Sequence, residues 1–146
     1  MSSNMISYIA LISSVVSMIT AIFGVGLGLI SIKRNKSIAI HEFLSKMESE
    51  DFISARESVY NNNNIIDIAE LIKDKNMSIV VNFFQHWGFL TRKGYLPLWA
   101  FDNGARPGVI RLYEKTEKFI QERRKLHKDE KYADQFEWLY VNLSKK

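Results

Sequence analysis

The sequence contains no cysteine, which excludes disulfide bonds and paired-cysteine zinc sites and removes any need for an oxidising compartment. It also lacks a glycine-rich phosphate loop, a His-Glu-x-x-His motif and a Gly-x-Ser-x-Gly motif. Its histidines, His41, His86 and His127, have no histidine partner at the i, i+4 spacing of a helical metal site. We therefore expect no catalytic residue, no metal site and no cofactor.

Charged side chains are absent from residues 1–32, and residues 6–32 are apolar apart from a few hydroxyls and glycines. As a helix this run would reach about 40 Å, more than the hydrocarbon core of a bilayer, which is about 30 Å thick. A cleaved signal peptide would be shorter and would carry basic residues before its apolar stretch, whereas Lys33, Arg34 and Lys36 follow this one. The sequence predicts a retained membrane anchor over residues 1–36.

The basic residues Lys33, Arg34 and Lys36 also predict the orientation of the anchor, because lysine and arginine near the end of a membrane helix favour the cytoplasmic side. We expect a single-pass protein with its N-terminus outside and residues 37–146 in the cytoplasm.

Small residues repeat along the anchor at alternating steps of three and four, which forms a heptad stripe on one helix face. They are Ser7, Ala10, Ser14, Ser17, Ala21, Gly24, Gly28 and Ser31. Gly24 and Gly28 form a Gly-x-x-x-Gly pair, which lets two backbones approach closely in a membrane. The stripe predicts a homo-oligomer held together through the bilayer. The alternative is that small residues are simply frequent in membrane helices, with hydroxyls bonding back to carbonyls one turn earlier.

A second alternative for the same helix is a pore. It would need Ser7, Ser14, Ser17 and Thr20 to face water in a helix assembly. The sequence carries no charged ring and no filter sequence of the kind that selective channels use.

Residues 37–146 are long enough for one modest domain, and their apolar positions recur at helical spacing. We predict an all-α fold, with the membrane helix followed by a compact cytoplasmic bundle of about five to six helices. Residues 77–91 should form the central helix and residues 106–127 the longest one. Sequence does not decide whether the anchor helix continues past residues 35–37 or breaks there.

Some positions carry specific expectations about burial. Four asparagines at residues 61–64 should end one helix and cap the next, which would bury Ile65, Ile68, Ala69 and Ile72. Large side chains at residues 96–101, Trp99 among them, should cover the core or lie on the membrane surface. The buried side of the longest helix should hold Val109, Leu112, Tyr113, Thr116, Phe119, Ile120 and Leu126.

The net charge of +4 is concentrated in residues 105–146, which hold 11 Lys and Arg against 7 Asp and Glu and include a basic cluster near the C-terminal end of the longest helix. We interpret Arg123, Arg124, Lys125 and Lys128 as a contact for lipid headgroups or an acidic partner. A phosphate site at Arg56 or at Arg123 and Arg124 competes with ordinary ion pairing inside the domain. Nucleic acid is not an expected partner, because acidic residues interrupt the cluster and the nearby aromatics fall at core spacing.

Several segments together resemble an uncharacterised family of small bacterial membrane proteins. They are Phe83-Phe84 to Gly94, Trp99 to Phe101, the long helix with its arginine-rich end, and Tyr132-x-x-x-Phe136-Glu137-Trp138-Leu139-Tyr140. The resemblance implies one membrane helix, a helical cytoplasmic domain and a place in the bacterial inner (cytoplasmic) membrane. It brings no catalytic residues.

These patterns predict a self-associating, membrane-anchored adaptor or effector without enzymatic activity, in a bacterial stress or phage-defence setting. Its partners would be the bilayer, further copies of itself and a protein that the sequence does not identify. An oligomeric, membrane-permeabilising effector is the first alternative, and an unrecognised membrane-bound enzyme is the second.

Overall fold

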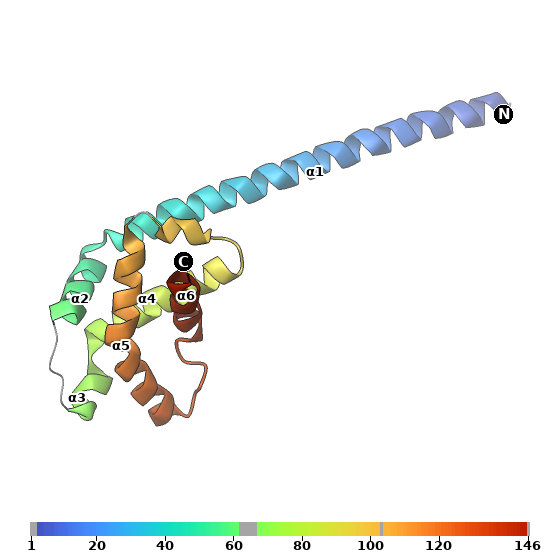
Figure 1. Cartoon of the computed structure of the whole chain (residues 1–146). Coiled ribbons are helices and arrows are strands. Elements are labelled where there is room, and N and C mark those ends of the chain that lie inside the picture. The colour runs from blue at the N-terminus through green and yellow to red at the C-terminus, as the bar shows by residue number, and fades with distance from the viewer. Residues whose placement is uncertain (1–2, 62–66, 103, 146) are drawn as a thin grey trace. The chain divides into compact units, whose positions relative to one another are not determined.

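The computed structural model describes residues 3–61, 67–102 and 104–145; within the N-terminal helix it describes the side chains at 13, 14, 16–25, 27, 28 and from 30 onward. In these residues the chain forms α-helices and one 3-10 helix, without any strand, so the predicted all-α fold is confirmed. The elements are α1 (Ser3–Met47), α2 (Glu50–Asn61), α3 (Ile68–Lys73), α4 (Lys75–Arg92), the 3-10 helix η1 (Leu98–Phe101), α5 (Ala105–His127) and α6 (Asp134–Ser144) (Figure 1).

Helix α1 runs through residues 35–37 without a break, which decides between the two alternatives that the sequence left open. Its part at Val16–Met47 is long and apolar enough to cross a membrane, and no other helix among the described residues is. Contacts divide the chain into two units, Met1–Ser37 and Ile38–Lys146. The last turns of α1 therefore belong to the second unit.

Helix α4 is the centre of the second unit, as its apolar sequence predicts. It contacts α2, α5 and α6 (Figure 1). Its buried residues lie on more than one face because helices cover it from several sides. They are Met77, Val80, Val81, Phe84, Trp87, Gly88 and Thr91.

An aromatic cluster joins the last turns of α1 to this centre. The side chain of Phe43 is fully buried. Its ring centroid lies 5.2 Å from that of Trp87 on α4 and 4.8 Å from that of Phe101 on η1. Burying a phenylalanine contributes about 1.5–3 kcal/mol, so Phe43 fixes residues 38–47 to the domain.

Helices α4 and α6 approach each other closely at Gly88. A Cβ atom at that position would lie 2.4 Å from the backbone oxygen of Gln135. Only glycine leaves room for this contact, and the α4–α6 pair consequently has the most extensive contact in the domain.

Two local signals define the ends of α4. Asp74 caps its start, because its carboxylate accepts hydrogen bonds from the backbone N–H groups of Asn76 and Met77. Gly94 (φ 79°) ends the helix in a Schellman motif, in which its N–H donates to Thr91 and that of Tyr95 donates to Leu90.

Expectations about burial were wrong at positions in α3 and in α5. Helix α3 buries Leu71, whereas Ile68 and Ala69 are exposed and Ile72 is half-buried, and its cap is Asp67. The predicted cap asparagines at 62–64 and the predicted core position Ile65 lie outside the described residues. Six residues are too few to establish a helical period, so the contact with α5 decides which side of α3 is buried.

In α5, burial was wrongly expected at Leu126, whose side chain is 57% exposed. The other expected positions of α5 are buried, the last of them being Ile120. Beyond Ile120 the helix has no buried residue, so Leu126 follows the helical period without a partner to cover it.

Candidate functional site

The apolar surface of α1 is the first candidate site. Every described side chain from residue 13 to residue 36 is exposed. The bulky ones include Met18, which is 68% exposed, and Phe23, which is 69% exposed. A helix with apolar side chains all around it needs hydrocarbon or another protein to cover it.

The small residues of the stripe lie on this surface. Ser14, Ser17, Ala21, Gly24, Gly28 and Ser31 are all exposed, and a Cβ added at Gly24 or Gly28 would meet nothing within 4 Å. The side chains of Ser7 and Ala10 lie outside the described residues. Thr20 donates its hydroxyl to the carbonyl of Val16 at 2.9 Å, so this hydroxyl is satisfied within its own helix.

The basic flank follows the apolar residues along the same helix. Lys33, Arg34 and Lys36 are all exposed. Three cations within one helical turn form a compact positive site at the end of the apolar surface.

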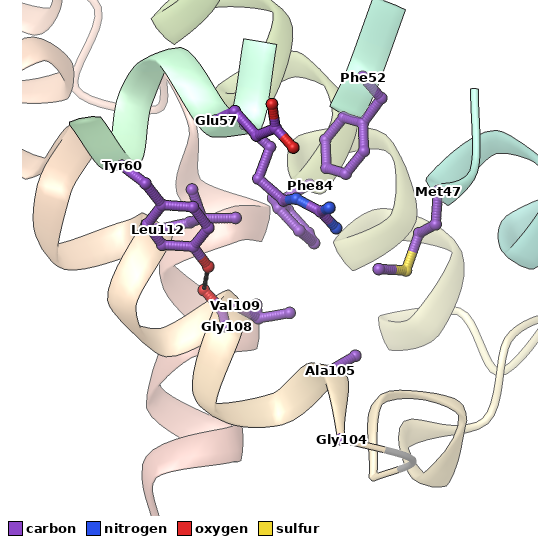
Figure 2. Close-up of a pocket in the computed structure, with 11 residues that line it drawn as sticks. Met47, Phe52, Glu57, Tyr60, Phe84, Gly104, Ala105, Gly108, Val109 and Leu112 are labelled. Atoms are coloured by element: carbon purple, nitrogen blue, oxygen red, sulfur yellow. Dashed lines mark hydrogen bonds between the residues drawn. The ribbon is translucent and has the colours of Figure 1, made fainter. Parts of the chain in front are cut away.

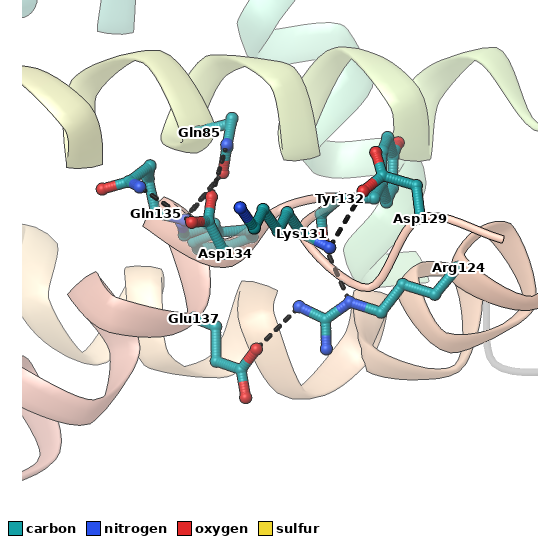
Figure 3. A network of polar contacts seen from close by, with 9 residues as sticks. Gln85, Arg124, Asp129, Lys131, Tyr132, Asp134, Gln135 and Glu137 are labelled. Atoms are coloured by element: carbon teal, nitrogen blue, oxygen red, sulfur yellow. Dashed lines mark hydrogen bonds and ion pairs between the residues drawn. The ribbon is translucent and has the colours of Figure 1, made fainter. Parts of the chain in front are cut away.

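The basic cluster of α5 divides into paired and open side chains, and Figure 3 shows the pairing of Arg124. Arg124 donates to the carboxylate of Glu137 at 2.7 Å and to the carbonyl of Tyr132 at 2.9 Å. Lys125 pairs with Glu122 at 2.8 Å. Arg124 therefore ties α5 to α6, and it is less available to an outside ligand than the sequence suggested.

Arg123 and Lys128 complete that cluster. The guanidinium of Arg123 lies 5.2 Å from the centroid of the Phe119 ring and donates to the Ser78 hydroxyl at 3.4 Å, while its Nε is buried without a hydrogen-bond partner. Lys128 is exposed and ends α5 in the left-handed region (φ 52°). Lys128 and Lys125 are thus the members that face solvent.

Sequence reasoning missed the role of Gln85, which holds the start of α6 (Figure 3). Helix α6 has no side-chain cap of its own at Ala133. The amide oxygen of Gln85 accepts from the backbone N–H of Gln135 at 2.9 Å, and its nitrogen donates to Asp134 at 3.0 Å. No local pattern could have indicated a cap that comes from another helix.

A cavity of about 300 Å³ lies between α2 and the start of α5 (Figure 2). Phe52, Phe84 and Leu112 are among the apolar residues that line it, and Arg56 and Glu57 are its charged ones. Tyr60 donates its hydroxyl to the carbonyl of Gly108 at 3.0 Å across one side. The cavity has the size of a small-molecule site, but its opposite charges give no clear preference for an ion.

Titratable groups in the described part of the chain give little sign of catalytic chemistry. His41, His86 and His127 are exposed, and the described residues contain no cluster of metal-ligating side chains. Three tyrosines are perturbed. Burial raises the pKa of Tyr60, Tyr113 and Tyr132, and that of Tyr113 reaches about 12. A tyrosine with a raised pKa stays protonated, so it cannot act as a base near neutral pH.

Comparison with known families gives one finding. The family model described as a domain of unknown function, DUF4760, matches residues 11–143. Its match begins inside α1, so the family domain includes most of the apolar helix together with the helical unit that follows. No curated protein and no solved structure matched the chain.

Proposed function

The chain belongs to the DUF4760 family of domains of unknown function, and from this premise we propose that it is a single-pass membrane protein that associates with copies of itself. Residues 38–146 would then act as an adaptor or effector domain that binds another protein without catalysis. The observation that carries the proposal is the uncovered apolar surface of α1.

The case for a membrane rests on the cost of leaving this surface in water. Exposed apolar area costs about 25 cal/mol per Å². Side chains such as Met18 and Phe23 are more than two thirds exposed. The family match begins at residue 11, so it includes most of this apolar helix. A bilayer is the environment that covers such a helix on every side.

The proposed orientation rests on charge. Lys33, Arg34 and Lys36 follow the apolar residues, whereas residues 1–32 contain no lysine or arginine. The positive-inside rule therefore favours an outside N-terminus and a cytoplasmic domain at residues 38–146. The resemblance to small bacterial membrane proteins points to the inner membrane.

Self-association is supported by the open space around Gly24 and Gly28. Lipid tails are as apolar as leucine, so membrane helices gain little from burying bulk against each other and more from close backbone approach. A face with Ala21, Gly24 and Gly28 allows this approach, whereas Ile19 and Ile22 keep backbones apart.

The experiment uses the absence of cysteine. Single cysteines placed at Ser17, Ala21, Gly24 or Gly28 in membranes that contain the full chain should form disulfide-linked dimers on mild oxidation. Matched cysteines at Ile19 and Ile22 should crosslink weakly. Equal crosslinking on both faces, or none on either, would contradict association through the stripe.

Resistance of the chain to alkaline carbonate extraction tests the anchor separately.

The same vesicles test the pore alternative. An adaptor should leave them impermeable to a trapped fluorescent dye. Dye release that disappears when Gly24 and Gly28 are both replaced with leucine would instead favour the permeabilising effector.

A further inference from the structure

Three aromatic side chains of the helical domain are exposed between the last turn of α4 and η1: Phe89 lies in α4, Tyr95 in the connection and Trp99 in η1. Phe89 is 46% exposed, Tyr95 is 52% exposed and Trp99 is 56% exposed. We call these three residues the aromatic surface. Arg92 and Lys93 are exposed beside it, and the Lys93 ammonium lies 5.8 Å from the centroid of the Phe89 ring.

The elements that carry the aromatic surface also hold the last turns of α1. Trp87 lies two positions before Phe89, and Phe101 lies two positions after Trp99. Both rings contact Phe43, at centroid distances of 5.2 and 4.8 Å. The aromatic surface is therefore at the end of the domain where α1 enters it.

Chain continuity places this end of the domain near the bilayer. Phe43 lies five residues after Ile38 in the same helix, which is a rise of about 7.5 Å. Ile38 lies two residues after Lys36, the last residue of the basic flank. If α1 spans the membrane, the flank lies among the headgroups, and the Phe43 end of the domain cannot be far from them.

The basic cluster of α5 is at the other end of the domain. Helix α5 begins at Ala105, just after η1, and its 23 residues extend about 33 Å before Lys128 (Figure 1). Within the domain, Lys125 and Lys128 therefore lie at the opposite end of α5 from η1 and Trp99.

We propose that the aromatic surface docks into the headgroup region of the same bilayer that α1 spans. This inference rests on the proposed function of α1 as an anchor. Tryptophan and tyrosine suit this region because each has an apolar ring and a polar group that can stay hydrated. Arg92 and Lys93 favour anionic headgroups.

The test measures Trp99 fluorescence in the full chain reconstituted into vesicles of phosphatidylcholine and phosphatidylglycerol. The chain has two other tryptophans, Trp87, which is buried, and Trp138, which is half-buried. The difference in emission between the unsubstituted chain and Trp99→Phe therefore gives the emission of Trp99 alone. Lipids with bromine atoms near the glycerol end of the acyl chains should quench most of the Trp99 emission. Vesicles of the same lipids without bromine supply the reference.

Leu126→Trp in the Trp99→Phe background is the matched control. Leu126 is 57% exposed, almost the same as Trp99, but it lies at the far end of α5. The added tryptophan should lose little emission in brominated vesicles. Replacing Phe89 and Tyr95 with serine should reduce the quenching of Trp99, without a shift in the unfolding midpoint of the domain.

The outcomes separate the two proposals. A chain that alkaline carbonate removes from the vesicles would overturn the anchor and the docking together. A chain that stays in the membrane with Trp99 quenched no more than the Leu126→Trp reporter would overturn the docking alone. Stronger quenching at Leu126→Trp would show that the basic end of the domain faces the lipid instead.

Discussion

Phe23 and Phe43 lie in one continuous helix and end in opposite environments. Phe23 is 69% exposed, whereas Phe43 is fully buried against Phe83, Trp87 and Phe101. The intrinsic gain from removing either ring from water is the same, about 1.5–3 kcal/mol. The difference is that the chain covers Phe43 with its own residues and leaves Phe23 to be covered by something else.

The substitution with the largest expected effect on this comparison is Phe43→Ala. It should lower the free energy of unfolding of the domain by about 3–5 kcal/mol, because it leaves a cavity among three aromatic rings. Urea titration of the full chain in detergent micelles, followed by tryptophan fluorescence, measures the loss. Leu44→Ala is the control at the next position, where the side chain is 46% exposed, and it should cost much less. Equal losses would mean that residues 38–47 do not pack as described.

The second test places a charge in the uncovered region. Ile22→Asp should cost about 3 kcal/mol of membrane insertion, since a carboxylate at the centre of a membrane helix loses its hydration. The measurement is the fraction of the chain that resists alkaline carbonate extraction. Ile38→Asp, at a 53% exposed position beyond the basic flank, should leave that fraction almost unchanged. Full retention of Ile22→Asp would argue against a bilayer around α1.

The third test makes the same substitution in both regions. Gly88→Ala forces a Cβ to within 2.4 Å of the Gln135 oxygen, and it should cost about 1–3 kcal/mol of domain stability because backbone must move. Gly28→Ala meets no atom within 4 Å and should leave the unfolding midpoint of the domain unchanged. A tolerated Gly88→Ala would show that α4 and α6 can separate at little cost.

The smallest expected effect is a change in the free energy of unfolding of the domain at alkaline pH. Burial is the main reason that the pKa of Tyr113 rises from 10.0 to about 12, with the negative charge of Glu137 adding to it. Below pH 10 both folded and unfolded states keep the proton, so Tyr113 adds no pH dependence. As the pH rises toward 12, the unfolded state loses its proton first and the free energy of unfolding falls.

At about pH 11 this loss should be about 1 kcal/mol from Tyr113. Tyr113→Phe should therefore flatten the alkaline part of the stability curve, measured by urea titration at a series of pH values. The free energy of unfolding of this variant should still fall somewhat with rising pH, because burial also raises the pKa of Tyr60 and Tyr132. Tyr95→Phe, at a 52% exposed position, is the control and should leave the curve as it was.

Local sequence predicted the helices where several turns repeat the same pattern. The longest domain helix was expected at residues 106–127 and lies at Ala105–His127, because Pro107 suits a first turn and six apolar positions keep the period. The same reasoning failed for α3, whose six residues carry too little periodic information. It also failed for Leu126, because a helical period continues whether or not another element is present to cover it.

The candidate surfaces differ in the same way. The small residues of α1 and the basic flank are properties of one continuous segment, so they could be identified before any fold was known. The pairing of Arg124 with Glu137 could not be predicted, because the turn between α5 and α6 brings them together. The exposure of Trp99 depended on which side of η1 packs on Phe43, since Leu96 and Phe101 in the same stretch are buried.

The sequence by itself determined that the chain is helical, that residues 1–32 carry no charge and that basic residues follow them, because composition and helical spacing are local properties. Only the tertiary structure decided that Phe43 joins the domain core, that Gln85 caps α6 from α4, and that Gly88 must have no side chain. Each of these depends on atoms that are distant in the chain and meet only after the helices have packed.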